Sequence, residues 1–243
     1  MRYALVFFLA STAAAQSSPE VEEILRPALH DASLGESLAF VAQDHDPGDP
    51  ATAGFSREVM EARVVEAFAK GTDVEQAQAF AAWTRRPDVS PFLAMERASG
   101  SPDYEQTINA FFDANEVDPR RVALVEEFLD AMGYGEYAAA VALHSLAGLG
   151  LLMDADEGGE PSAERLDELV DELEATRGDQ IYDHAYLRML DTYYVAFADA
   201  SLPDLERFVD AVWEDPAQWY AARLPVVMLS AYDRALVEAA QEL

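Results

Sequence analysis

Prolines that directly follow a helix-capping residue recur along the chain and constrain its fold more than any other feature. Four such pairs occur, at Ser18-Pro19, Ser90-Pro91, Ser101-Pro102 and Asp118-Pro119. A Ser or Asp side chain accepts a hydrogen bond from the first free N–H groups of a helix, and proline in the first turn has no N–H to leave unsatisfied. Each pair therefore predicts the start of a helix.

Apolar residues between these starts follow the helical period. Met60, Val64 and Phe68, for example, recur every four residues, which places them on one face of a helix. No stretch alternates between apolar and polar residues for long enough to predict a strand pair. We therefore expect about ten or eleven helices and no sheet. The predicted fold class is all-α, a compact multi-helix bundle of two related helical repeats.

Glycine and proline mark the expected ends of helices. Three glycines stand where C-terminal caps are expected, at Gly71, Gly133 and Gly178. Pro27 lies within the first apolar-periodic segment, where a proline removes a backbone hydrogen bond. We expect Pro27 to kink or end that helix.

The first fifteen residues have the pattern of a secretory signal peptide. Arg2 provides the positive charge, residues 4–10 form a short apolar run, and Ala13-Ala14-Ala15 fits the small-residue cleavage site. The apolar run is far shorter than the roughly 20 residues of a membrane span. The chain has no cysteine, which excludes a lipid-modified cysteine anchor, disulfides and thiolate metal sites. We expect an exported protein, periplasmic or extracellular, whose mature part (16–243) is one all-helical domain.

The chain is strongly acidic along its whole length. It has 46 Asp and Glu against 16 Lys and Arg, a net charge of −30, and Lys70 as its one lysine. Such a surface repels nucleic acid and anionic lipid headgroups, which excludes both as partners. Abundant carboxylates with few lysines resemble the surfaces of proteins adapted to high salt. Calcium storage is a weaker alternative, because the acids do not cluster at ligand spacing.

One segment, from Tyr137 to Met153, is almost wholly apolar. It is rich in Ala and Gly, contains His144 and Ser145, and has no Lys or Arg near its ends. These features favour a central helix buried on all sides by its neighbours over a membrane span. The charged, glycine-containing stretch 154–161 that follows is the candidate flexible joint of the chain.

The sequence contains an internal repeat in which matching residues lie 129 positions apart. Repeat 1 covers about 55–98 and repeat 2 about 184–228. In each copy a helix ends in Ala-Phe-Ala, and a capped turn leads to a helix of about twelve residues with a tryptophan near its end. A proline and a further apolar helix follow. At this distance of 129 positions, Trp83 and Trp213 fall one position apart.

The second copy has a likeness to a known family. Residues 190–228 read LDTYYVAFADASLPDLERFVDAVWEDPAQWYAARLPVVM. This segment resembles the bacterial exported family named domain of unknown function 2059, in which a capped helix with an aromatic near its end precedes a final helix with Pro-x-x-Met. The matching residues are Ser201, Asp204, Leu205, Trp213, Pro216, Pro225 and Met228. Asp215 and Ala217 depart from the usual Ser and Gly. The resemblance implies an all-helical exported protein and no catalytic residues.

The four histidines are the natural candidates for chemistry, and none is supported by its surroundings. They are His30 beside Asp31, His45 between two aspartates, His144 in the apolar segment and His184 beside Asp183. A carboxylate beside a histidine can orient the ring for general-base catalysis. In so acidic a chain such neighbours arise by chance, and no two histidines have the H-x-x-x-H spacing of a zinc site.

The stretch that begins at Asp154 resembles the first residues of a calcium-binding EF-hand loop but lacks the full set of ligands. The twelfth position is Arg165, where an EF-hand requires a bidentate Glu. We therefore expect no catalytic, cofactor-binding or metal-binding residues and no cofactor.

Five residues of one helix face (Tyr182, Tyr186, Met189, Tyr193 and Phe197) are expected to pack in the core, although a ligand groove would use the same stripe.

These observations predict a non-enzymatic exported protein that acts by helix-mediated association in the periplasm or envelope. Its partner would be another protein. The alternative is a carrier of a small apolar ligand or lipid, which needs a groove of roughly 300 Å³ or more between the two repeats. A hydrolase is disfavoured, because the sequence contains no assembled set of catalytic residues.

Overall fold

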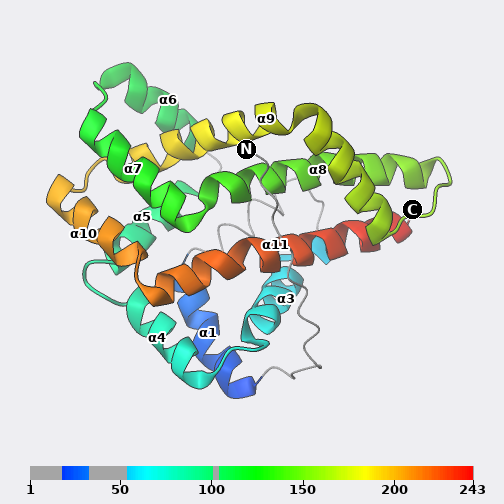
Figure 1. Cartoon of the computed structure of the whole chain (residues 1–243), viewed down its shortest axis with the longest axis horizontal. Helices are drawn as coiled ribbons and strands as arrows, with labels where there is room; N and C mark the ends of the chain where they lie inside the picture. The colour runs from blue at the N-terminus through cyan, green and yellow to red at the C-terminus, as the bar shows by residue number, and fades with distance from the viewer. Residues whose placement is uncertain (1–17, 33–53, 101–103, 243) are drawn as a thin grey trace.

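A computed structural model describes residues 18–32, 54–100 and 104–242 (Figure 1). Within these ranges the chain forms ten helices and no strand, which confirms the all-α prediction. The predicted signal peptide and the loop around His45 lie outside the described residues. The helices are α1 (Pro19–Asp31), α3 (Arg57–Ala69), α4 (Val74–Thr84), α5 (Ser90–Ser99), α6 (Tyr104–Ala114), α7 (Pro119–Met132), α8 (Tyr134–Asp156), α9 (Ala163–Ala196), α10 (Leu202–Val212) and α11 (Asp215–Gln241).

Several predicted helix boundaries agree with the structure. The Asp118 side chain accepts a hydrogen bond of 2.9 Å from the Arg120 N–H at the start of α7. Gly133, at φ 64°, ends α7 and allows the chain to enter α8 at once. The predicted helix end at Gly178 was wrong, because Gly178 lies inside the 34-residue α9. Pro27 does not end α1, which continues to Asp31. Tertiary packing overrides both local signals.

Helices α4 and α10 are equivalent, and their matching residues lie 128 positions apart. Each helix has 11 residues, and each begins at a side chain that accepts a hydrogen bond from the N–H three residues later. All five buried residues of α4 match the five buried residues of α10: Ala77, Phe80, Ala81, Trp83 and Thr84 correspond to Leu205, Phe208, Val209, Ala211 and Val212.

The helices before and after this pair also match. Buried residues Val89, Phe92, Leu93 and Glu96 of the α5 region correspond, again 128 positions apart, to Ala217, Tyr220, Ala221 and Leu224 of α11. Helices α1 and α7 correspond at a distance of 100 positions. Their cap–proline pairs coincide, and so do the buried residues Leu25, Ala28, Leu29 and Ala32 with Val125, Phe128, Leu129 and Met132.

These matches define two units of the same helix order. The first unit is α1, α3, α4 and α5. The second unit is α7, the end of α9 (186–196), α10 and the beginning of α11 (215–225). In Figure 1 helices α7 and α10 of the second unit lie at the upper left with α5 of the first unit beside them, and α1, α3 and α4 lie below α11.

The fourth helix of each unit packs into the other unit. Phe92 of α5 stacks on Phe208 of α10, with ring centroids 4.4 Å apart, and meets Phe197 edge-on at 5.4 Å. In the reverse direction, Tyr220 of α11 stacks on Phe80 at 5.0 Å and on Phe68 at 5.8 Å. Because Phe92 corresponds to Tyr220 and Phe208 to Phe80, the exchange is reciprocal and relates the units by an approximate twofold axis.

The approximate twofold axis passes through the contacts between equivalent residues of the two units. Trp83 donates its indole N–H to the carbonyl of Ala211, its equivalent 128 residues later, over 3.0 Å. Arg86 forms an ion pair with its own equivalent, Glu214. The predicted match of the two tryptophans was therefore wrong. Trp83 is buried and matches Ala211, whereas Trp213 follows α10 and is 51% exposed.

The second unit contains an insertion that the described part of the first unit does not have. Matching residues are 100 positions apart at α1 and α7 but 129 apart at α3 and the end of α9, so the second unit has 29 more residues between its first two helices. Within the described residues, α8 and 163–185 of α9 have no equivalent in the first unit. We call this part (134–185) the extension. It forms a helical hairpin that lies along the second half of α11 (Figure 1), and the predicted joint at 154–161 falls at its tip.

Candidate functional site

The three histidines of the described residues lie on three different helices, α1, α8 and α9. His30 Nε2 lies 3.3 Å from Glu61 Oε2, on the exterior of the α1–α3 contact. His184 is exposed on α9. His144 of α8 is mostly buried, and its Nδ1 lies 2.6 Å from Oδ1 of Asp233 on α11. Each described histidine that has a carboxylate partner thus joins two helices, which is a structural role.

The acidic tip of the extension holds no calcium loop. Both nitrogens Nε and Nη2 of Arg165 contact Asp154 Oδ2, at 2.9 and 2.8 Å, and Nη1 contacts Glu168 at 3.1 Å. The arginine therefore occupies the position that a cation would take. Among the described residues, no group of three or more His, Asp or Glu side chains has the geometry of a metal site.

The aromatic stripe of α9 packs inward, as expected. Tyr193 and Phe197 are buried in the core, and Tyr182 and Tyr186 are half-buried with their rings stacked at 6.1 Å. A Cβ atom at Gly135 would lie only 2.6 Å from Cδ2 of Tyr186, so α8 can approach this stripe only because residue 135 is glycine. The stripe fixes the extension to the second unit.

A buried carboxylate lies at the centre of the core. Glu96 of α5 is only 7% exposed, and its Oε1 accepts hydrogen bonds from the hydroxyls of Tyr134 at 3.0 Å and Tyr193 at 2.9 Å. Burial, together with the charge of Glu96, raises the pKa of both tyrosines well above its ordinary value. The pair of phenol donors stabilises a polar group that would otherwise be costly to bury.

Two of the scarce arginines hold the ends of other helices. Arg121 donates to the carbonyls of Phe197 and Ala200 at the end of α9. Arg223 donates to the carbonyls of Phe68, at 3.2 Å, and Lys70, at 2.7 Å, at the end of α3. A cationic side chain at a helix C-terminus donates hydrogen bonds to the free carbonyls and is attracted by the negative end of the helix dipole. These arginines are therefore engaged within the fold.

The space between the two units is filled by aromatic rings. Contacts among the rings of Phe92, Phe128, Phe197 and Phe208 have centroid distances between 4.4 and 5.8 Å. A cavity of about 210 Å³ lies elsewhere, among the ends of α1, α4 and α5. Five of its six lining residues are charged or carry a hydroxyl, and the sixth is Leu93. A groove for an apolar ligand between the repeats is not found among the described residues.

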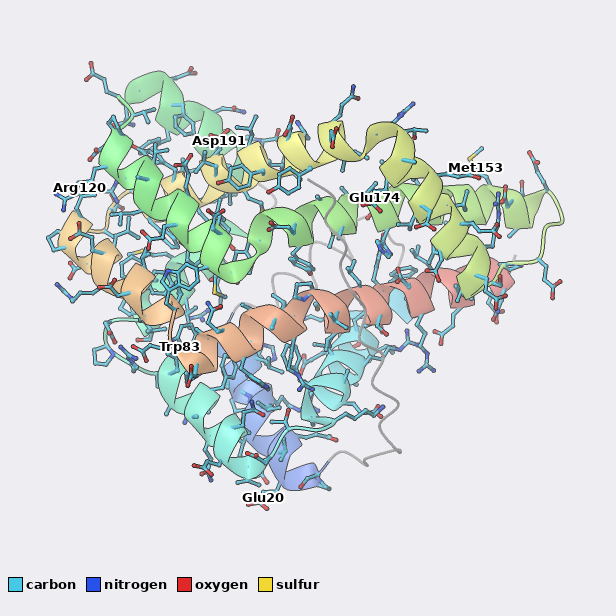
Figure 2. All side chains as sticks on the ribbon, in the orientation of Figure 1. Glu20, Trp83, Arg120, Met153, Glu174 and Asp191 are labelled. Atoms are coloured by element: carbon cyan, nitrogen blue, oxygen red, sulfur yellow. The ribbon has the colours of Figure 1, made fainter. Side chains whose placement is uncertain are left out.

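Helix α8 carries an exposed apolar stripe. Leu146, Leu149 and Met153 are 43%, 59% and 67% exposed, and their spacing places them on one helix face. The prediction that this helix is buried on all sides was therefore wrong, because only 33% of its most apolar 18-residue window is buried. By length and composition, α8 is also the one described helix that could cross a membrane. Met153 projects outward at the edge of the molecule in Figure 2.

Carboxylates border this stripe. Helix α9 runs antiparallel to α8 here, since Gly150 lies against Leu169 and Asp154 pairs with Arg165. Residues 164–174 of α9 carry six exposed acids, which are Glu164, Asp167, Glu168, Asp171, Glu172 and Glu174. Glu168 is linked to α8 through Arg165 and Asp154, whereas Asp167 lies toward Asp233 of α11. Glu174 is labelled in Figure 2. The result is an apolar surface beside a row of negative charge.

The sequence predicted neither the buried carboxylate of Glu96 nor the exposed stripe of α8. Glu96 has a visible signal, because its distance of four residues from Phe92 places an acid on the apolar face of a helix. The exposure of α8 has no such signal, since its sequence is apolar on every side. Only the positions of α9 and α11 decide which face is covered.

A scan against protein-family models, a search of curated proteins and a search of solved structures each find no match to this chain. The resemblance of residues 190–228 to domain of unknown function 2059 thus stays a prediction.

Proposed function

We propose that this chain is a non-enzymatic, exported association module that binds another protein through α8. The single observation that carries the proposal is the exposed stripe of Leu146, Leu149 and Met153 on an otherwise strongly acidic protein. Contiguous apolar side chains are costly to expose, and on folded proteins they commonly mark a docking surface.

The location of the stripe supports the proposal. The two units bury their apolar faces in each other, so the duplicated core is accounted for by stability alone. The extension adds a hairpin whose outer face contacts nothing in the described part of the chain. We infer that the extension, and not the duplicated core, supplies the specific function. The export expected from residues 1–15 places this function in the periplasm or outside the cell.

Site-specific photo-crosslinking in the native host tests the proposal. A benzophenone amino acid replaces Leu149 in one variant, and Gln78, an exposed residue of α4, in a control variant. We expect a discrete cross-linked product from position 149 and none from position 78. The product is expected to weaken strongly when Leu146 is also changed to Ser. Identical products from both positions, or none from either, would contradict an association through α8.

A further inference from the structure

The chemistry around the stripe restricts the kind of partner that can bind there. Resting on the proposed function, we infer that the occupant of the α8 stripe is an amphipathic helix of a second protein, apolar on one face and flanked by Lys or Arg. Two independent properties of the surface lead to this inference: the spacing of its apolar side chains and the sign of the charge beside them.

The apolar spacing fits a helix. Leu146, Leu149 and Met153 stand at intervals of three and four residues, and they form a ridge along the outer face of α8. Ridges of this spacing pack into the grooves of a second helix, whose own apolar residues recur at the same intervals. The stripe extends over two helical turns, which matches the contact length of a short amphipathic segment.

The charge beside the stripe selects the flanks of that helix. Residues 134–196, which contain α8 and α9, carry 14 Asp and Glu against three Arg and no Lys. Residues 164–174 of α9, which run beside α8, contain the six exposed acids and one basic residue, Arg165. This arginine already pairs with Asp154 and Glu168. A helix with basic flanks would therefore gain charge complementarity on both approach and binding.

The same charge opposes the other occupants. A second copy of this chain would bring an identical acidic border against the first, on molecules that each carry a net charge of −30. An anionic membrane surface is repelled for the same reason. For a basic amphipathic helix, both the apolar contact and the electrostatic attraction favour binding.

Two synthetic peptides of about 18 residues distinguish these occupants. Both have leucines at helical spacing on one face, and the remaining positions are Lys in one peptide and Glu in the other. A third peptide has the Lys composition in scrambled order. Fluorescence anisotropy measures the binding of each peptide to the full-length protein in about 0.15 M salt, where the Debye length is about 8 Å. We expect the Lys amphipathic peptide to bind at least tenfold more tightly than the other two.

Variants of the protein assign the binding to the stripe. The double variant Leu146→Ser/Leu149→Ser is expected to weaken the Lys amphipathic peptide at least tenfold, and Glu168→Lys/Glu172→Lys to weaken it by a similar factor. Trp213→Ser is the control, because Trp213 is a large exposed side chain on the duplicated core. Circular dichroism of each variant confirms that it is folded.

Each remaining outcome overturns the inference in a recognisable way. Equal binding of the ordered and scrambled Lys peptides means that charge alone attracts them. Equal binding of the Lys and Glu amphipathic peptides means that charge selects nothing. Light scattering that shows a dimer dependent on Leu149 assigns the stripe to a second copy, and binding to phosphatidylcholine vesicles assigns it to a membrane. If cross-linking from position 149 succeeds while the peptides fail, association stands and only the basic partner is wrong.

Discussion

Trp83 donates its indole N–H to the carbonyl of Ala211, the residue that matches it 128 positions later in the second unit. The contact joins equivalent positions, so it lies on the approximate twofold axis of the duplicated core. Arg86 and Glu214, three residues further along each unit, repeat the relationship at the surface. The two units are therefore arranged like the subunits of a symmetric dimer within one chain.

The tryptophans provide a matched test of this arrangement. Trp83→Ala removes a large side chain that is only 2% exposed and leaves the Ala211 carbonyl without its donor. We expect the free energy of unfolding to fall by about 3–5 kcal/mol. Trp213→Ala, at a half-exposed residue, is expected to change it by less than about 0.5 kcal/mol. Urea unfolding measures both. Similar losses in the two variants would contradict the structural match of Trp83 with Ala211.

The exchange of fourth helices, α5 and the beginning of α11, predicts which aromatic residues are coupled. A double-mutant cycle between Phe92→Leu and Phe208→Leu is expected to show an interaction energy of about 0.5–1.5 kcal/mol. The same cycle between Phe92 and Phe80 is expected to give a value near zero, because in the described residues their rings do not touch. Coupling of Phe92 to Phe80 would mean that each unit packs its fourth helix within itself.

Glu96 is expected to stabilise the core by accepting two hydrogen bonds. Glu96→Leu leaves the Tyr134 and Tyr193 hydroxyls without this acceptor, whereas Glu96→Gln retains one oxygen. The Leu variant should therefore be less stable than the Gln variant, by about 1–3 kcal/mol. Thermal or urea unfolding measures the difference. A Leu variant as stable as the Gln variant would show that the tyrosines find other acceptors.

The buried phenols predict that the protein loses stability at alkaline pH. Burial raises the pKa of Tyr134, Tyr193 and Tyr220 well above the usual 10, and that of Tyr104 to about 12. Unfolded tyrosines lose their protons near pH 10, so above that pH the folded state binds more protons than the unfolded state. The stabilisation is complete below pH 10 and decreases as the pH rises through the folded values.

Urea unfolding at a series of pH values, combined with the ultraviolet absorbance of tyrosinate, measures this effect. Most of the tyrosinate signal is expected to appear together with unfolding. A full signal from a protein that is still folded would contradict the burial of these hydroxyls.

The net charge of −30 predicts that stability increases with salt. Carboxylates along the whole surface repel one another, and molar salt shortens the Debye length to about 3 Å. We expect the melting temperature to rise steadily from dilute buffer to about 1 M sodium chloride. Sodium chloride and tetramethylammonium chloride should act alike if screening is the cause. A melting temperature that does not change with salt would contradict self-repulsion.

Much of the fold is predictable from local signals, and particular residues show where those signals fail. The cap at Asp118 and the turn at Gly133 act within a few residues of themselves, so their effects are visible in the sequence. Pro27 and Gly178 act just as locally, yet each lies inside a helix. Packing of the surrounding helix contributes more free energy than the roughly 1–3 kcal/mol that one unfavourable residue costs.

The repeat is partly visible in the sequence and fully visible only in space. One constant distance of 129 positions aligns Phe68 with Phe197 but misplaces Trp83. The cap Ser201 follows Phe197 by four positions, whereas the cap Asp73 follows Phe68 by five. Matching burial shows the correct register. The exchange of Phe92 and Tyr220 between units has no sequence signal, since either unit offers an aromatic surface on which these rings can pack.

The sequence by itself determined the helices, the acidic surface and the absence of any cysteine-based chemistry, because each depends on residue type and near neighbours. The tertiary structure alone decided which faces of those helices are covered. Glu96 is buried because Tyr134 and Tyr193 donate to it from distant helices. Leu149 is exposed because α9 and α11 lie against the other side of α8. An apolar sequence favours burial on every side, but only the neighbours that are present can cover it.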